Sequence, residues 1–174
     1  MHRPGLVLRE TVLNDVPKMA LIMEQASAAR KSEPLPTKVI DPADLTYLEE
    51  RLSRVGAWSV LATMDSEVVG FVAGNPVKDL AEQSVGAPES VMTEDLGLIM
   101  VSPQCWGLGI GQKLLDWSAD FHRVQGKQRL ELWTQEENLR ARSLYERLGY
   151  VLTGETKIRA GEAMVRYRLS LSGR

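Results

Sequence analysis

DLGLIMVSPQCWGLGIGQKLLDW, the stretch Asp95–Trp117, decides the fold of this chain. Its segment Leu96–Val101 is a short apolar run with β-branched residues, which is typical of a buried strand. Pro103 has no backbone N–H and therefore ends the strand. Three glycines follow within Gly107–Gly111, and apolar residues then return at helical spacing. The stretch predicts a strand, a glycine-rich turn and a helix, in that order.

This order of elements predicts an anion site at the start of the helix. Glycines let the backbone approach a ligand closely, and the first-turn N–H groups of a helix have no intrahelical acceptor. Together with the helix dipole they favour a phosphate or a diphosphate. The P-loop pattern fails because Lys113 follows Gln112 and precedes Leu114, and the dinucleotide pattern fails because Gly111 comes one residue early. A purely structural turn stays open.

Length and composition indicate one globular domain, residues 1–174. The hydrophobic fraction of 44% and the charged fraction of 25% are ordinary. A net charge of −2 argues against nucleic acid as a partner. No apolar stretch approaches the ~20 residues of a membrane span, and the start has no signal-peptide pattern. Two distant histidines disfavour a metal site, and the single Cys105 fits a reducing cytoplasm.

Strand and helix patterns continue on both sides of this stretch. Helical spacing of apolar residues predicts helices at Met19–Ala26, Leu45–Val55 and Asn138–Leu148. Further strands are predicted at Leu6–Glu10, Trp58–Met64, Val68–Ala73, Gln128–Thr134, Val151–Leu152 and Met164–Leu171. Gly70 inside a strand suggests a bulge or a close contact. Asn75–Thr93 reads as a long loop, either a flap beside the substrate or a solvated connector.

Two blocks resemble the motifs of the GNAT superfamily of acyl-CoA N-acyltransferases. Val101–Pro103, Gly109 and Gly111 match motif A, a Val-x-Pro strand exit followed by Gln/Arg-x-x-Gly-x-Gly/Ala. Trp106 is a departure, because it stands where the family usually has Gln or Arg. NLRARSLYERLGY, residues Asn138–Tyr150, matches motif B, Asn-x-x-Ala-x-x-Leu-Tyr-Glu-x-x-Gly-Phe/Tyr. The two blocks stand in the family order.

The resemblance covers Asp95–Tyr150 and implies a GNAT fold of the α/β class. Such a fold has a mixed, mostly antiparallel sheet of about six to seven strands, splayed at the fourth strand, with about four helices on both faces. The implied activity is transfer of acetyl from acetyl-CoA to a primary amine of a small molecule or peptide, by direct attack through a ternary complex. Cys105 has no histidine nearby in sequence to activate it as a nucleophile. A homodimer is compatible with this interpretation.

The resemblance also implies roles for single residues. The strand backbone would pair with the pantetheine arm, the turn would hold the pyrophosphate, and the start of the next helix would contact the cofactor. These groups are Ile99, Met100 and Val101, then Trp106, Gly107, Leu108, Gly109, Ile110 and Gly111, and finally Asn138. Tyr145 would lie beside the sulfur and return a proton to the departing thiolate. A tyrosine titrates near ~10, so it is protonated at pH 7.

The attacking amine also needs a proton acceptor. Asp95 lies where many relatives carry a strand carboxylate facing the acceptor, and Glu94 is its neighbour. Alternation along a strand sends the two to opposite faces, so at most one serves, and we favour Asp95. Trp133 stands at another base position used by some relatives and cannot act as one. Solvated charges at the start of the strand are the alternative.

Two other functions stay open at this point. A non-catalytic CoA-binding sensor or partner-binding module on the same fold is favoured by Trp106, whereas Asn138 and Tyr145 speak against it. An acyltransferase for a longer acyl-CoA is the second alternative. The sequence does not indicate whether the acceptor is an amino acid, a polyamine, an antibiotic or a peptide N-terminus.

Overall fold

A computed structural model describes residues 5–76 and 93–172 of the chain, and seven strands in this part form one sheet. The order in the sheet is β1-β2-β3-β4-β5-β7-β6. The strands are β1 (Leu6–Glu10), β2 (Trp58–Met64), β3 (Glu67–Pro76), β4 (Thr93–Val101), β5 (Arg129–Gln135), β6 (Val151–Arg159) and β7 (Glu162–Ser170). The described α-helices are α1 (Val16–Arg30), α2 (Pro42–Leu52), α4 (Ile110–Val124) and α5 (Leu139–Arg147). The predicted mixed α/β sheet is confirmed.

The chain divides into two compact units that alternate along the sequence. The first unit comprises Met1–Ala73 and Leu98–Leu115, and the second comprises Gly74–Gly97 and Asp116–Arg174. The chain therefore passes from one unit to the other three times, inside β3, inside β4 and inside α4. That residues 1–174 behave as one domain stays a prediction.

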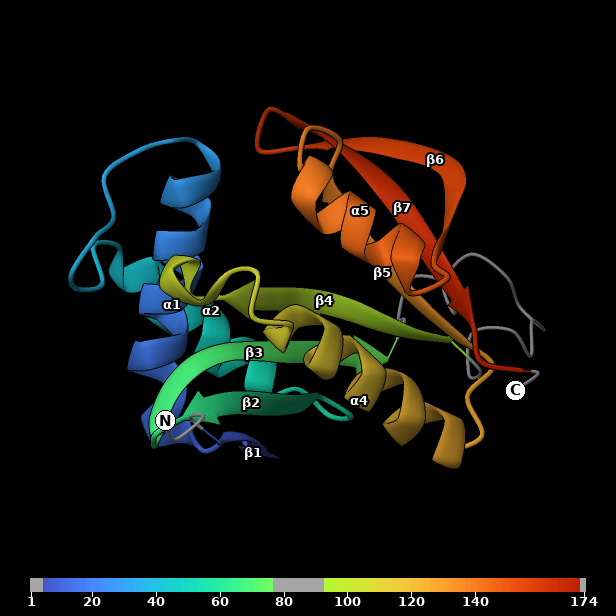
Figure 1. Ribbon diagram of the computed structural model, residues 1–174, viewed down its shortest axis with the longest axis horizontal. Coiled ribbons are helices and arrows are strands. Elements are labelled where there is room, and N and C mark those ends of the chain that lie inside the picture. The colour runs from blue at the N-terminus through green and yellow to red at the C-terminus, as the bar shows by residue number, and fades with distance from the viewer. Residues whose placement is uncertain (1–4, 77–92, 173–174) are drawn as a thin grey trace. The chain divides into compact units, whose positions relative to one another are not determined.

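The first unit is built on the neighbouring strands β1, β2 and β3, which run side by side in Figure 1. β1 pairs with β2 antiparallel, with Leu6 opposite Met64. A two-residue turn, Asp65 and Ser66, joins β2 to β3, and both residues have positive φ, 50° and 68°. Two positive φ values are what a tight hairpin turn requires to match the twist of its strands. The strands predicted at Trp58–Met64 and Val68–Ala73 therefore form a hairpin.

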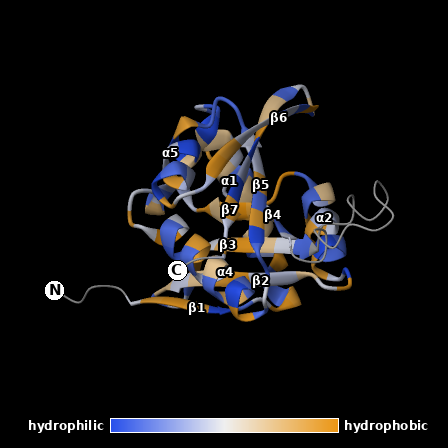
Figure 2. Ribbon diagram, turned by 90° about the vertical axis from the view of Figure 1, so that its right-hand side faces the viewer, coloured by the Kyte–Doolittle hydropathy of each residue, from blue (hydrophilic) through white to orange (hydrophobic). Residues whose placement is uncertain are grey.

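Helices α1 and α2 close the core of the first unit. Figure 2 shows the hydrophobic colouring along β3, whose inner residues meet these helices. Met19 of α1 and Leu48 of α2 have no exposed surface, so both side chains fill this core. The core cluster consists of Val16, Met19, Ala20, Ile22, Leu48, Leu61, Phe71, Ala73 and Leu98.

Gly70 marks the place where β3 passes closest to the end of β4. A Cβ atom on Gly70 would lie 2.9 Å from the Met100 carbonyl oxygen and 3.3 Å from side-chain carbons of Val101 and Ile110. The close contact suggested by the sequence is confirmed. Its consequence is that β3 holds both the exit of β4 and the first residue of α4, so the turn between them has fixed ends.

The second unit contains β5, β6 and β7, with α5 beside them in Figure 1. β7 pairs antiparallel with both β5 and β6. The first residues of β4, Thr93–Asp95, pair parallel with Arg129–Glu131 of β5. Among the described residues this parallel pairing covers only those three positions, in agreement with the predicted splay at the fourth strand.

Candidate active site

The turn between β4 and α4 is shaped by its own backbone hydrogen bonds. The Ser102 amide donates to the Val69 carbonyl at 2.8 Å, which ties the strand exit to β3. A single 3₁₀ turn, Pro103–Cys105, follows. Gly107 and Gly109 then have φ of +84° and +79°, a region that side chains with a Cβ rarely adopt. The glycines of the turn are therefore required by its backbone conformation.

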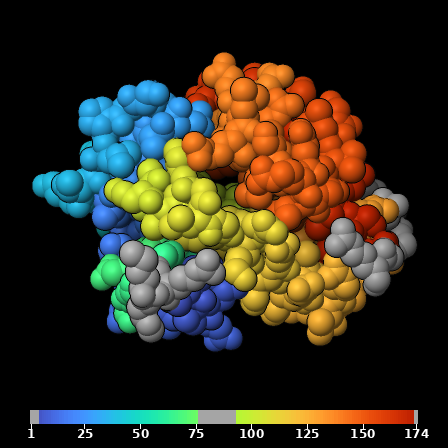
Figure 3. All heavy atoms as spheres, viewed as in Figure 1, coloured from blue at the N-terminus to red at the C-terminus, as the bar shows by residue number. Residues whose placement is uncertain are grey.

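The helix that follows begins with amides that have no acceptor within the helix. Gln112 is exposed and Gly111 is half-buried, whereas Ile110 is only 1% exposed. The first helical hydrogen bond of α4 is donated by the Lys113 amide to the Gly109 carbonyl at 3.1 Å. The N–H groups of Ile110, Gly111 and Gln112 come before it and have no acceptor in the helix. A Cβ atom on Gly107 or Gly109 would meet nothing within 4 Å. Figure 3 shows the turn at the surface, in yellow-green. Open amides on the positive end of a helix fit a diphosphate.

Trp106, the departure from the family pattern, serves the structure of the turn. Its indole Nε1 donates to the Val101 carbonyl at 2.8 Å, and its backbone amide donates to the Pro103 carbonyl at 3.2 Å. The Leu108 amide donates to the Cys105 carbonyl at 3.4 Å. These two backbone amides are thus used internally. Among the residues predicted to contact the pyrophosphate, this leaves the backbone amides of Gly107, Gly109, Ile110 and Gly111.

The predicted pantetheine strand, Ile99–Val101, is half-buried along its length. The Met100 carbonyl faces β3, because it is the nearest atom to a Cβ on Gly70. Polar backbone groups alternate in direction along a strand, so those of Ile99 and Val101 face away from β3. Since Trp106 already binds the Val101 carbonyl, the backbone of Ile99 is the group best suited to an added strand.

Tyr145 of α5 lies in the second unit between two other tyrosines. Its ring centroid is 5.9 Å from that of Tyr150 and 5.6 Å from that of Tyr167. The side chain is 4% exposed. Burial raises the pKa of Tyr145 far above its ordinary value, and a hydrogen bond with the Thr134 side chain offsets this only in part. The hydroxyl is therefore protonated at neutral pH.

Three hydrogen bonds, made by the side chains of Tyr167 and Asn138, hold α5 in place. The Tyr167 hydroxyl donates to Glu146 Oε1 at 2.7 Å and accepts from Arg142 Nε at 3.0 Å, which joins β7 to the helix. Asn138, the predicted cofactor contact, caps the helix by accepting from the Ala141 amide at 3.4 Å through Oδ1. The cap uses the carbonyl end of the Asn138 side chain, so its Nδ2 group points away from this bond and can serve a ligand.

The two predicted base candidates have different surroundings. Glu94 is 4% exposed and forms an ion pair with Lys127, Nζ to Oε1, at 2.7 Å. Asp95 is half-buried and stands opposite Glu131 in the β4–β5 ladder. Burial and the neighbouring Arg168 lower the pKa of the Arg166 guanidinium, and the charge of Asp95 opposes this lowering only in part. Glu94 is thus held in an internal ion pair, which leaves Asp95 as the base candidate.

Sequence reasoning missed an ion network on β5, β6 and β7. Glu131, 2% exposed, accepts from Arg166 Nη2 and from Arg168 Nε, the latter at 2.7 Å. Arg166 also pairs with Glu155 at 2.6 Å. Only the alternation of Arg166 and Arg168 along β7 signals this network in the sequence. The buried carboxylate of Glu131 and the guanidinium of Arg166 thus link the three strands next to Asp95.

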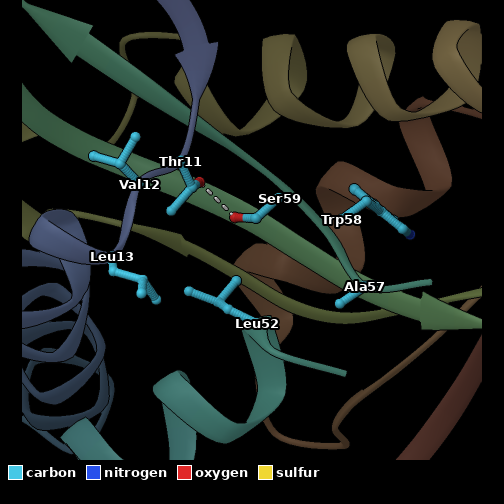
Figure 4. A pocket seen from close by; sticks show the side chains of 7 residues that line it. All are labelled: Thr11, Val12, Leu13, Leu52, Ala57, Trp58 and Ser59. Carbon is cyan, nitrogen blue, oxygen red and sulfur yellow. Dashed lines mark hydrogen bonds between the residues drawn. The ribbon is translucent and has the colours of Figure 1, made fainter. Parts of the chain in front are cut away.

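A separate hollow of about 250 Å³ lies in the first unit. Figure 4 shows its lining, in which the Thr11 hydroxyl donates to Ser59 Oγ at 2.8 Å. Its lining residues are Thr11, Val12, Leu13, Leu52, Ala57, Trp58 and Ser59. None of these is a predicted site residue and none carries a charge. The hollow therefore supplies no acid, base or nucleophile.

Comparison with known proteins gives a family match. Residues 23–150 match the model of the acetyltransferase (GNAT) family. The chain is 37% identical over 71 residues to mycothiol acetyltransferase of Beutenbergia cavernae, covering 41% of this chain and 24% of that protein. It is 33% identical over 101 residues to 5-NmdU N-acetyltransferase of Pseudomonas phage PaMx11, covering 57% and 61%. The chain thus spans less than two thirds of these relatives.

Solved structures show the same fold. The ribosomal-protein-S18-alanine N-acetyltransferase from Escherichia coli matches with a TM-score of 0.72 at 19% identity, covering 98% of this chain and 96% of that one. The protein yncA from Salmonella typhimurium, solved with its cofactor acetyl-CoA, matches with a TM-score of 0.69 at 18% identity, covering 97% and 95%. At these identities the likeness concerns the fold. No helix in residues 5–76 or 93–172 has the length and apolarity of a membrane span.

Proposed function

The chain belongs to the acetyltransferase (GNAT) family, and we propose that it transfers acetyl from acetyl-CoA to a primary amine by direct attack in a ternary complex. The observation that carries the proposal is the turn before α4. Its open amides, with two glycines at positive φ, form a cradle for a diphosphate. Acetyl-CoA supplies a thioester whose acetyl group an amine can accept, and it carries such a diphosphate.

The residues of the first unit would bind the nucleotide end of the cofactor. The amides of Ile110, Gly111 and Gln112 would donate to the diphosphate oxygens, because they have no acceptor within the helix. The backbone of Ile99 would pair with the pantetheine arm. Trp106 would act indirectly, by holding the turn against Val101.

Tyr145 would hold the proton that the sulfur receives when its bond to the acetyl group breaks. Burial keeps this hydroxyl protonated. Its bond with Thr134 fixes the direction of the hydroxyl, and the two flanking tyrosine rings fix the position of the Tyr145 ring. Asn138 would donate from Nδ2 to the cofactor at the start of α5.

Asp95 is proposed as the base that takes the proton of the amine. A terminal α-amine with a pKa near ~8 is roughly one tenth neutral at pH 7, whereas a lysine with a pKa near ~10.4 is neutral about once in 2,500 molecules. An α-amine would therefore need less help from Asp95 than a lysine. The relatives described above are named for three different acceptors, mycothiol, 5-NmdU and an alanine of ribosomal protein S18, so the acceptor of this chain stays open.

A homodimer and a cytoplasmic location also stay proposals. The cytoplasmic location rests on the single Cys105 of the sequence. The homodimer rests on compatibility with the family alone.

Calorimetry and an acetylation assay test the proposal together. We expect acetyl-CoA to bind, and a panel of primary amines to include at least one that releases free thiol and gains an acetyl group. Matched tertiary amines serve as controls and should release none. Binding without acylation of any amine would favour the non-catalytic CoA-binding module, and a preference for longer thioesters would favour the longer-chain acyltransferase.

A further inference from the structure

The Tyr150 hydroxyl is a buried polar group without a partner. Tyr150 is 3% exposed, and its hydroxyl makes no hydrogen bond in the described part of the chain. Burial raises its pKa far above the ordinary value, and the nearby Tyr145 and Asp116 raise it further, so the group stays protonated and can donate. Buried hydroxyls nearly always have a partner, and an unmet one costs stability. Such a group therefore points to a ligand.

The chain geometry fixes Tyr150 beside Tyr145. Helix α5 ends at Arg147, Gly149 follows its cap with φ of +86°, and the Tyr150 amide then donates to the Tyr145 carbonyl at 3.0 Å. This is the bond pattern of a glycine-terminated helix, which reverses the chain in one fixed way. This chain reversal brings Tyr150 back to Tyr145, and the centroids of the two rings lie 5.9 Å apart.

Tyr167 provides the contrast on the other side of Tyr145. Its ring lies at a similar centroid distance, 5.6 Å, but its hydroxyl both donates to Glu146 and accepts from Arg142. The three tyrosines thus differ in one respect. The hydroxyls of Tyr145 and Tyr167 are engaged within the protein, whereas that of Tyr150 is not.

We propose that the Tyr150 hydroxyl donates a hydrogen bond to the thioester end of acetyl-CoA bound beside Tyr145. The inference rests on the proposed function, in which Tyr145 lies next to the sulfur. A donor held next to Tyr145 meets the atoms nearest that sulfur, which are the thioester oxygen and the adjoining pantetheine amide oxygen. Both are acceptors. Tyr150 is therefore a binding residue for the acyl end of the cofactor.

The test compares Tyr150→Phe with Tyr167→Phe, two variants that each lose one hydroxyl from the same cluster. For both variants and the wild type, calorimetry measures binding of acetyl-CoA and of the nucleotide end of CoA without its pantetheine arm. Thermal unfolding of the ligand-free proteins gives the second readout. The motif itself accepts Phe at the position of Tyr150, so this variant keeps a residue that the fold accommodates.

We expect Tyr150→Phe to bind acetyl-CoA about fivefold more weakly, the worth of one neutral hydrogen bond. It should bind the nucleotide fragment normally, and its unfolding temperature should stay the same or rise. Tyr167→Phe should unfold at a lower temperature with both affinities unchanged.

Three results would overturn the inference. They are unchanged acetyl-CoA affinity in Tyr150→Phe, an equal loss of affinity for the fragment, or a drop in unfolding temperature as large as that of Tyr167→Phe, which would reveal an internal partner. If the wild type itself fails to bind acetyl-CoA, the proposed function is wrong instead, so the two failures are distinguishable.

Discussion

The turn before α4 and the cluster of Tyr145, Tyr150 and Tyr167 would serve different parts of the proposed reaction in different ways. The turn acts through backbone amides, and its residues Gly107–Gly109 are exposed. The cluster acts through side-chain hydroxyls, and each of its three tyrosines is at most 4% exposed. A backbone cradle tolerates changes of side chain, whereas a buried hydroxyl is specific to its residue. Variants of the turn should therefore change cofactor affinity, and variants of the cluster should change turnover.

The largest effect is expected from Tyr145→Phe. Turnover should fall at least tenfold because the proton donor is lost, while acetyl-CoA affinity stays nearly unchanged because the ring still packs between Tyr150 and Tyr167. Steady-state kinetics and calorimetry measure the two quantities. Wild-type turnover in this variant would remove Tyr145 from the mechanism.

Gly109→Ala tests the other side of the comparison. Its φ of +79° disfavours any residue with a Cβ, so the turn should lose about 1–2 kcal/mol of stability. Misdirected amides should weaken acetyl-CoA binding about tenfold, the worth of one hydrogen bond to a charged group. Gly126→Ala is the matched control, with φ of +76° and nothing within 4 Å of its Cβ.

Denaturant unfolding and calorimetry follow both glycine variants. Equal losses of stability with a loss of affinity only in Gly109→Ala support the cradle. Equal affinities in the two variants would mean that the turn does not bind the cofactor.

His122 gives the second unit a pH dependence that backbone amides cannot have. Burial lowers its pKa in the folded chain below the ordinary ~6.5, although Glu94 and a bond to the Ser118 carbonyl at 2.8 Å act the other way. Between the two pKa values of His122, the imidazole therefore binds a proton in the unfolded chain but not in the folded chain. Stability should be full above pH ~6.5 and fall as pH decreases below it, by at most about 1.4 kcal/mol per pH unit.

Denaturant unfolding at several pH values between about 7.5 and 5.5 measures this slope. His122→Asn should flatten it, because that variant has no group at this position that titrates in the range. A slope that survives the substitution would assign the effect to another group.

Trp106→Phe should have the smallest effect. It removes only the Nε1 bond to the Val101 carbonyl, which is worth about 1 kcal/mol of unfolding free energy. Acetyl-CoA affinity should change less than threefold, because no indole contact with the cofactor is proposed. Thermal unfolding measures the stability and calorimetry measures the acetyl-CoA affinity. A loss of affinity as large as that of Gly109→Ala would mean that the indole contacts the cofactor directly.

The sequence predicted the elements whose signals are local. Pro103 and the glycines of the turn locate the end of β4 and the start of α4, and Gly149 locates the end of α5. β6 was predicted only as Val151–Leu152, yet it extends to Arg159. Its remaining residues are mostly polar and exposed, so they lack the apolar alternation that marks a strand. Backbone geometry needs no such alternation at the edge of a sheet.

The partners of the site residues could not be predicted, because they depend on the register between distant segments. Nothing near Glu94 in sequence points to Lys127, and nothing near Tyr167 points to Arg142. The backbone part of the candidate site follows from local sequence, whereas the side-chain part follows from packing. Most of the predicted flap at Asn75–Thr93 lies outside the described residues, so it stays a prediction.

The most direct test of the central claim is the amide NMR spectrum of the turn during titration with acetyl-CoA. We predict that the N–H signals of Ile110, Gly111 and Gln112 shift strongly, and that the nucleotide end of CoA alone produces most of the same shifts. Binding of acetyl-CoA with these three signals unmoved would contradict the account.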